Sequence, residues 1–110
     1  MKRLNELSVN KLDERLWEVF SLYIRLRDCN ENGTGKCITC GKYKNWQYVD
    51  AGHGITRRNF CTKYDERNNH FQCKPCNNWG SGERALYAEQ VDEKYGAGTW
   101  TELEQKSRKS

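Results

Sequence analysis

Apolar residues near the start of the chain repeat with the period of an α-helix. Between Asn10 and Arg27 they fall at i, i+4, i+7, i+11 and i+14, which is one helical face. Asn10 suits an N-cap, and Asp13 lies in the first turn, where the helix dipole favours an acid. We therefore predict an N-terminal amphipathic helix within residues 10–28, whose apolar face packs on the rest of the domain. That face consists of Leu12, Leu16, Val19, Tyr23 and Leu26.

The last third of the chain also favours helices. Glu83 to Lys94 is helical by propensity, with Tyr87 and Val91 on one side, and Trp100 to Lys106 follows as a short helix after a glycine-containing break. These segments predict C-terminal helices over residues 83–106. The remaining residues, Ser107 to Ser110, are expected to form a frayed tail.

The middle of the chain shows no helical period. Trp46 to Asp50 is a short run of aromatic and β-branched residues, which predicts a strand. A second extended segment is predicted near Ile55 to Arg58. Two glycines flank His53 and indicate a tight, exposed backbone around this histidine.

Composition narrows the class of protein. The chain has 110 residues, of which 35% are hydrophobic, so residues 1–110 are expected to form one domain with a thin core. The first ten residues lack the apolar run of a signal peptide, and no segment has the length of a membrane span. These features favour a cytoplasmic protein with reduced thiols. The net charge of +4 suits a polyanionic partner, although a solvated surface explains it equally well.

Two Cys-x-x-Cys pairs are the most specific motif. Each pair can place two thiolates on one tetrahedral ion, so together they predict a closed, structural zinc site. Gly41 follows the first pair, as in a zinc knuckle, and a helix is expected to begin after the second pair, with an interruption near Gly80-Ser81-Gly82. A knuckle, a hairpin and then a helix make an α+β treble-clef arrangement, with its zinc core over residues 37–80. The predicted ligands are Cys37, Cys40, Cys73 and Cys76.

Other uses of the cysteines are less favoured. Two disulfides are one alternative, and a redox Cys-x-x-Cys is another, but a redox motif is expected once and beside a βαβ pattern, which is not evident here. Cys29 and Cys61 remain outside the pairs, and we expect each to be a small buried apolar residue.

The interval between the two pairs is longer than the ~15–20 residues of many purely structural zinc ribbons. The segments at residues 50–59 and 66–77 resemble the HNH, or ββα-metal, nuclease motif. In that motif a histidine ends the first strand, an asparagine precedes the second cysteine pair, and a His or Asn follows that pair on the helix. The matching residues are His53, Asn68 and Asn77.

A closer resemblance extends over most of the chain, roughly from Lys11 to Leu103. It is to the NinG (Rap) family of phage recombination proteins, and it includes residues outside the zinc pairs. The resemblance implies a phage-encoded endonuclease that acts in the host cell on branched intermediates such as Holliday junctions and D-loops. The segments that carry it are Lys11-Leu12-Asp13, Tyr23 to Cys29, Cys37 to Lys42, Asp50 to His53, Asp65 to Asn68 and Gln72 to Asn77.

The chemistry of phosphodiester hydrolysis assigns roles to these residues. A neutral imidazole can take a proton from water near neutral pH, so His53 is the candidate general base. A catalytic Mg²⁺ or Mn²⁺ takes oxygen ligands, for which Asn77 and Asp50 are the candidates. Many HNH nucleases place an acid immediately before the base, but Gly52 occupies that position here. Asp50 lies three residues before His53, and a hydrogen bond inside the hairpin is the alternative role for its carboxylate. Asn68 is expected to hold the loop that bears His53.

Several cations surround this segment. Arg57 and Arg58 follow the candidate base, and they form either a phosphate clamp or a solvated pair. Lys63, Arg67 and Lys74 are weaker candidates for DNA contacts. His70 is a rival histidine three residues before Cys73, for which a structural role is favoured over contact with phosphate.

Three functions remain open at this point. The first is a structure-selective DNA endonuclease, the second a non-selective nicking nuclease, and the third a non-catalytic zinc module that binds DNA or a protein. Because a Holliday junction has two-fold symmetry, we also predict a homodimer. The Asn10–Arg27 helix is the candidate contact, unless its apolar face is used on its own core.

Overall fold

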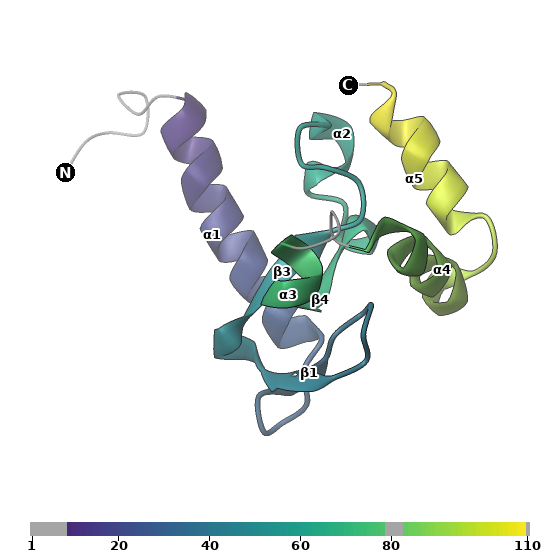
Figure 1. Ribbon diagram of the computed structural model, residues 1–110. Helices are drawn as coiled ribbons and strands as arrows, with labels where there is room; N and C mark the ends of the chain where they lie inside the picture. The colour runs from purple at the N-terminus through teal and green to yellow at the C-terminus, as the bar shows by residue number, and fades with distance from the viewer. Residues whose placement is uncertain (1–8, 79–82, 110) are drawn as a thin grey trace.

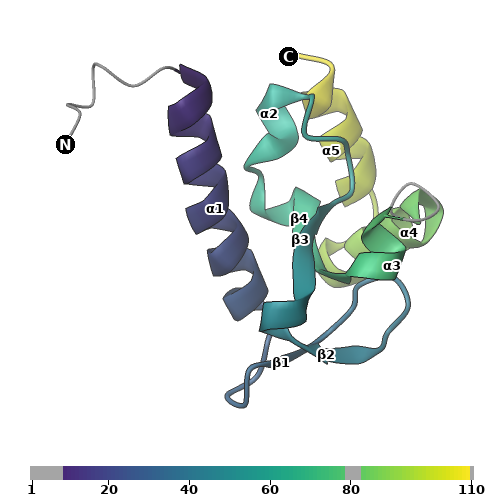
Figure 2. The same ribbon diagram turned by 60° about the vertical axis from the view of Figure 1, so that its left-hand side comes forward.

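The computed structural model describes residues 9–78 and 83–109 (Figure 1). It has an α+β fold with a two-stranded sheet between helices. The strands β3 (Val49–His53) and β4 (Asn69–Cys73) are antiparallel. Helix α1 (Val9–Arg27) lies on one side of this sheet, whereas α4 (Arg84–Tyr95) and α5 (Thr99–Ser107) lie on the other (Figures 1 and 2).

The remaining elements are short. Strands β1 (Thr34–Lys36) and β2 (Tyr43–Asn45) form a second antiparallel sheet below the first. Helix α2 (Phe60–Lys63) lies in the connection between β3 and β4, and α3 (Lys74–Asn78) follows β4 directly. The predicted order of knuckle, antiparallel pair and helix is therefore present. The predicted interruption near Gly80-Ser81-Gly82 lies outside the described residues.

The C-terminal helices cover the core. Ile55, Tyr87, Val91 and Leu103 are buried together, with Ile38 and Trp100 packed against them. This confirms that Tyr87 and Val91 share the inner side of a helix. The two predicted C-terminal helices are also confirmed within one or two residues at each end, although Ser107 belongs to α5 rather than to a frayed tail.

The N-terminal helix was predicted correctly, but the prediction of its packing face is wrong. Ile24 is buried, and Trp17 and Phe20 on the same side are half-buried against the sheet and the α2 region. The predicted face instead points to solvent, with exposed fractions of 67% for Val19 and 48% for Tyr23. The helix has two apolar sides, and the aromatic side fits against His53 and Tyr64, a contact that periodicity alone cannot reveal.

The predictions of the strands also need correction. Trp46–Tyr48 is a 3₁₀ turn, capped by the Asn45 side chain, which accepts a hydrogen bond of 2.9 Å from the Gln47 amide. The strand begins only at Val49 and continues to His53. Residues 55–58 form no strand, because the backbone of Ile55 pairs with the Asn68 side chain instead of a neighbouring strand. The true partner of β3 is β4, which the sequence analysis did not assign as a strand.

Candidate metal centre and catalytic cleft

The four cysteines of the two pairs come together at one end of the β3–β4 sheet. The Sγ atoms of Cys37, Cys40, Cys73 and Cys76 all lie within 4.8 Å of one another. The Sγ atoms of Cys40 and Cys73 are 3.7 Å apart. Two thiolates bound tetrahedrally at Zn–S of about 2.3 Å are separated by about 3.8 Å, so the cluster fits a zinc ion. This confirms the predicted four-cysteine site, which is able to hold a metal such as zinc.

The backbone conformation and the hydrogen bonds around the first cysteine pair favour the binding of a cation. Gly41 has a φ of 77°, a left-handed conformation that favours glycine, and its amide donates to the Cys37 carbonyl at 3.0 Å. Burial opposes ionisation of the Cys37 thiol, but hydrogen bonds from Thr39 and from backbone amides outweigh it and lower the pKa of this thiol to about 6. Burial raises the pKa of the Cys73 thiol to about 12.

The two other cysteines lie outside the cluster, as predicted. Cys29 and Cys61 are half-buried, whereas we predicted that each would be fully buried. The Cys29 thiol donates to the Leu26 carbonyl at 3.4 Å. Neither residue joins the metal centre among the described residues.

A cleft of about 570 Å³ runs along the free edge of β3. It brings together three of the predicted site residues, Asp50, His53 and Asn77, together with Arg57. Asp50 and His53 are three residues apart and therefore leave opposite faces of a regular strand. Both reach the same cleft because β3 has no neighbour on that edge within the described residues. Its other lining residues are Trp17, Ser21, Ala51, Gly54, Thr56 and Arg84.

Asp50 is the acidic group of the cleft. Its Oδ2 accepts a hydrogen bond of 2.9 Å from Asn77 Nδ2, and its Oδ1 pairs with the Lys74 ammonium at 2.7 Å. The contact between Asp50 and Asn77 joins the middle of β3 to the helix that carries the last cysteine. Both oxygen-bearing side chains therefore lie next to the four-cysteine cluster, since Asn77 follows Cys76 directly on α3. The alternative predicted for Asp50 was a hydrogen bond inside the hairpin, whereas the observed partners of its carboxylate, Lys74 and Asn77, belong to α3.

His53 is held against α1. Its imidazole stacks on the Trp17 indole, with ring centroids 4.5 Å apart and an interplanar angle of 21°. Burial, and then the nearby cations Arg57 and Lys63, lower the pKa of His53 from 6.5 to about 4. The imidazole is therefore neutral at pH 7, which is the form that a general base requires. The backbone around it is less exposed than predicted, since Gly52 is buried and Gly54 half-buried.

Asn68 lies beneath the cleft and is completely buried. Its Oδ1 accepts from the Ile55 amide at 2.7 Å, and its Nδ2 donates to the carbonyls of Ile55 at 3.0 Å and Thr62 at 3.1 Å. The Gly54 amide donates to the Asn68 carbonyl at 3.0 Å. Asn68 thus fixes the loop that leaves His53. These hydrogen bonds agree with the prediction that Asn68 holds the loop that bears His53.

The predicted cations differ in their availability. Arg57 and Arg58 are exposed. Lys63 is nearly buried and forms an ion pair with Asp13 of α1, so it is not free to contact phosphate. Arg67 pairs with Asp65 and Glu102, and Lys74 pairs with Asp50. Arg57 lies over the Trp17 ring at 5.4 Å and is the predicted cation that also lines the cleft.

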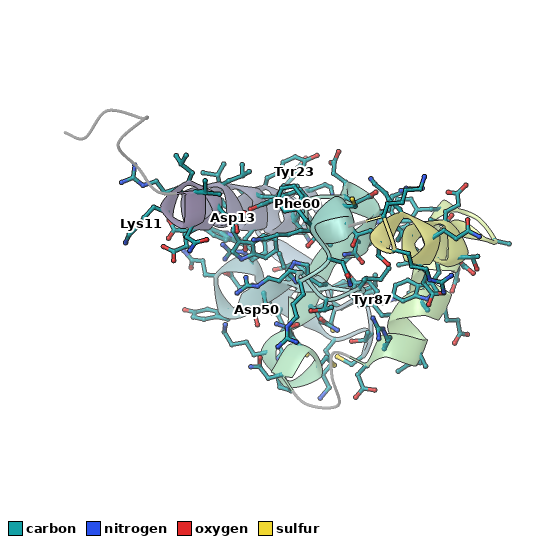
Figure 3. The ribbon with its side chains drawn as sticks, turned by 90° about the horizontal axis from the view of Figure 1, so that it is seen from above. Lys11, Asp13, Tyr23, Asp50, Phe60 and Tyr87 are labelled. Atoms are coloured by element: carbon teal, nitrogen blue, oxygen red, sulfur yellow. The ribbon has the colours of Figure 1, made fainter. Side chains whose placement is uncertain are left out.

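His70 is structural, as the sequence analysis favoured. It is 1% exposed, with Nδ1 2.9 Å from the Tyr87 hydroxyl and Nε2 2.8 Å from the Tyr95 hydroxyl. Tyr87 donates in turn to the Gly52 carbonyl at 2.6 Å. Burial, and then the nearby Lys94, lower the pKa of His70 to about 3. Figure 3 shows Tyr87 on the α4 and α5 side of the molecule, away from Asp13 of α1.

Sequence reasoning missed Trp17, Arg84 and the role of Asp13. Trp17 and Arg84 line the cleft from α1 and α4. Asp13 pairs with Lys63 and accepts a hydrogen bond of 2.5 Å from the Tyr64 hydroxyl, which ties α1 to the region after α2. No local motif marks these residues, because their partners lie tens of residues away along the chain.

Fold and site together define a small α+β protein with a four-cysteine metal-binding cluster beside a histidine-containing cleft. The family model described as the bacteriophage lambda NinG protein matches residues 2–110. The chain therefore belongs to this family, which makes it a phage protein related to recombination. No curated protein and no solved structure matches the chain. Within the described residues, none of the helices is both long and apolar enough to cross a membrane.

Proposed function

We propose that this protein is a metal-dependent endonuclease of the HNH type that cuts branched recombination intermediates, such as Holliday junctions and D-loops, in the cytoplasm of the bacterial host. The observation that carries the proposal is the meeting of His53, Asp50 and Asn77 in one cleft. Membership of a phage recombination family supports DNA as the substrate. The whole chain is proposed to act as one domain.

His53 is proposed as the general base. Its neutral imidazole accepts a proton from an attacking water while that water approaches the phosphorus atom. Burial lowers the pKa of His53 to about 4, which keeps the imidazole unprotonated across the physiological range. Asn68 holds the following loop by hydrogen bonds, so the imidazole meets the phosphate without rearrangement of the backbone.

Asp50 and Asn77 are proposed to hold a catalytic Mg²⁺ or Mn²⁺. Their side chains already touch, and carboxylate and amide oxygens are the donors that these hard cations prefer. Such an ion, when bound, supplies charge stabilisation to the phosphate and the leaving oxygen. For both residues to act as ligands, the Asn77 amide must turn its oxygen toward Asp50, and the Asp50 carboxylate must release Lys74. The four-cysteine cluster remains a scaffold in this arrangement.

Arg57 is the proposed phosphate contact nearest to the base, and Arg84 faces the same cleft. Arg58 is exposed beside it, and Arg67 and Lys74 contribute only after leaving their present carboxylate partners. Lys63 is not retained as a DNA contact because Asp13 already neutralises it.

The decisive experiment is a cleavage assay with a labelled four-way junction and a linear duplex of the same sequence. We expect junction cutting that requires Mg²⁺ or Mn²⁺ and falls about 10²–10⁴-fold in His53→Ala. The His53→Ala protein should keep its zinc and its affinity for DNA. Equal cutting of both substrates would leave a non-selective nicking nuclease. No cutting by folded, zinc-loaded protein with either ion would support a non-catalytic zinc module.

A homodimer through α1 is also proposed. The outer side of α1 exposes an apolar row that its own core does not use. Within this row, Leu16 and Leu22 lie three residues on either side of Val19, and all three side chains are exposed. Two copies of such a helix can pair antiparallel about a two-fold axis, which is one form of an isologous interface. In Figure 3, Tyr23 lies on the side of α1 away from Asp50, so this pairing leaves the cleft open.

Sedimentation with and without junction DNA tests the dimer. We expect a dimer for the wild type and a monomer for Val19→Glu, because a charge in the centre of the row opposes pairing. Leu86→Glu is the matched control, since Leu86 is a similarly exposed leucine on α4. A wild type that stays strictly monomeric at working concentration, with and without DNA, would remove the proposal.

A further inference from the structure

Trp17 is the residue in closest ring contact with the proposed general base. The indole and the His53 imidazole are almost parallel at a centroid separation of 4.5 Å. Trp17 belongs to α1, whereas His53 ends β3, so this contact crosses between two elements far apart in the sequence. Helix α1 therefore forms one wall of the cleft.

The imidazole lacks the hydrogen-bond partner that usually orients a catalytic histidine. Its Nε2 is buried, and it has no hydrogen-bond partner among the described residues. General bases are normally held by a third group that bonds to the second ring nitrogen. Because Nε2 is shielded from water, Nδ1 is the nitrogen left to accept a proton from the cleft.

The indole is itself held rigidly. Its ring lies 5.9 Å from Phe20 and 6.1 Å from Tyr64, measured between centroids. The Tyr64 hydroxyl donates to Asp13 one turn earlier in α1, and Asp13 also pairs with Lys63. Trp17 thus joins His53 to a fixed group of side chains rather than to a mobile surface.

We propose that Trp17 is the positioning residue for His53, and that ring stacking takes the place of the usual orienting hydrogen bond. The indole holds the imidazole plane so that Nδ1 faces the cleft and Nε2 stays covered. The catalytic part of this inference rests on the proposed function of His53. The orientation of the imidazole itself can be measured without any activity.

The histidines make a spectroscopic test simple, because the chain has only two of them. In the zinc-loaded protein, the His53 ring carbon-bound protons should be shifted upfield by the indole ring current. In Trp17→Leu they should return toward the values of an exposed histidine, whereas Trp17→Phe should keep part of the shift. Phe60→Leu is the matched control, since Phe60 is an exposed aromatic residue on α2 that does not line the cleft.

Kinetics provide the second readout. In Trp17→Leu we expect kcat for junction cleavage to fall by up to about a hundredfold, the loss typical of a misplaced catalytic group. KM and zinc content should stay unchanged, and Trp17→Phe should recover most of the rate. Phe60→Leu should leave kcat within about twofold of the wild type.

The outcomes separate the two hypotheses. His53 signals that do not move in Trp17→Leu would overturn the positioning role, as would equal losses of kcat in Trp17→Leu and Phe60→Leu. If the signals move as expected but the wild type cuts no DNA, Trp17 still orients His53 and only the proposed nuclease function fails.

Discussion

The two ends of the β3–β4 sheet carry two different kinds of site. Val49 pairs with Cys73 at the end where the four thiols gather, and His53 pairs with Asn69 at the other. The cysteine cluster needs two short motifs and one strand pairing. The cleft draws side chains from α1, β3, the following loop, α3 and α4. A metal scaffold can therefore be compact in sequence, whereas the proposed reaction site depends on the whole fold.

The largest effect should come from removing the metal centre. Cys73→Ser removes a ligand at the end of β4, and we expect the protein to lose zinc and unfold cooperatively. Structural zinc contributes roughly 10–16 kcal/mol in small domains, which is comparable to the whole stability of about 5–15 kcal/mol. Circular dichroism measures the loss of folded structure, and the zinc stoichiometry of the purified protein measures the loss of the metal. Cys61→Ser should retain both zinc and fold. A folded, fully zinc-loaded Cys73→Ser protein would show that the cluster is not the scaffold.

A smaller loss is expected in Asn68→Ala, at the cleft end of the sheet. The change leaves the buried amide and carbonyl of Ile55 without their partner and removes one of the hydrogen bonds to the Thr62 carbonyl, which should together cost about 3 kcal/mol. Urea unfolding at constant zinc measures the free energy of unfolding. Asn59→Ala is the matched control, because the Asn59 side chain makes no capping hydrogen bond, and it should change stability by less than about 0.5 kcal/mol. Equal losses in the two variants would contradict the role of Asn68.

The buried histidine behind the sheet predicts a dependence of stability on pH. The pKa of His70 is about 3 in the folded protein, whereas the ordinary pKa of a histidine, which applies to the unfolded chain, is 6.5. Between pH 3 and pH 6.5 the unfolded chain therefore binds more protons than the folded protein. The contribution of the neutral His70 to the free energy of unfolding is complete above pH 6.5 and is lost as the pH falls toward 3. Relative to His70→Gln, the wild type should lose about 1 kcal/mol more per pH unit below 6.5. Urea unfolding of both proteins at equal zinc concentration, between pH 5 and 7.5, measures the difference in their free energies of unfolding. If this difference does not change with pH, the effect is ruled out.

The smallest effect concerns the cations of the cleft. Within residues 9–78 and 83–109, Arg57 makes no ion pair with a carboxylate, whereas Arg67 is engaged by Asp65 and Glu102. Arg57→Ala should weaken DNA binding and reduce the slope of log affinity against log salt by about one. Arg67→Ala should change that slope much less. Measuring the affinity of both variants for a four-way junction over a range of salt concentrations distinguishes them. An unchanged slope in Arg57→Ala would show that Arg57 does not contact a DNA phosphate.

Much of the protein could be predicted from local patterns. The spacing of the cysteines gave the four ligands, and the helical period gave α1 with nearly correct bounds. Asn68 was expected to hold the loop after His53, and it does. The strand after Cys40 was placed too early, because the aromatic run Trp46–Tyr48 has β propensity but is turned by the Asn45 cap. Strand β4 was missed because all five of its residues are buried, so no polar alternation marks it.

The sequence by itself determined the metal centre and the presence of the helices. Cys-x-x-Cys spacing and a helical period of 3.6 residues are properties of short segments, so they can be recognised without knowing how the rest of the chain folds. Only the tertiary structure decided which side of α1 is buried and which cations are free. Lys63 is neutralised by an acid fifty residues earlier, and Trp17 meets His53, which lies 36 residues later in the chain. Such contacts depend on how β3, β4 and α1 pack together, and no single segment of the sequence specifies that packing.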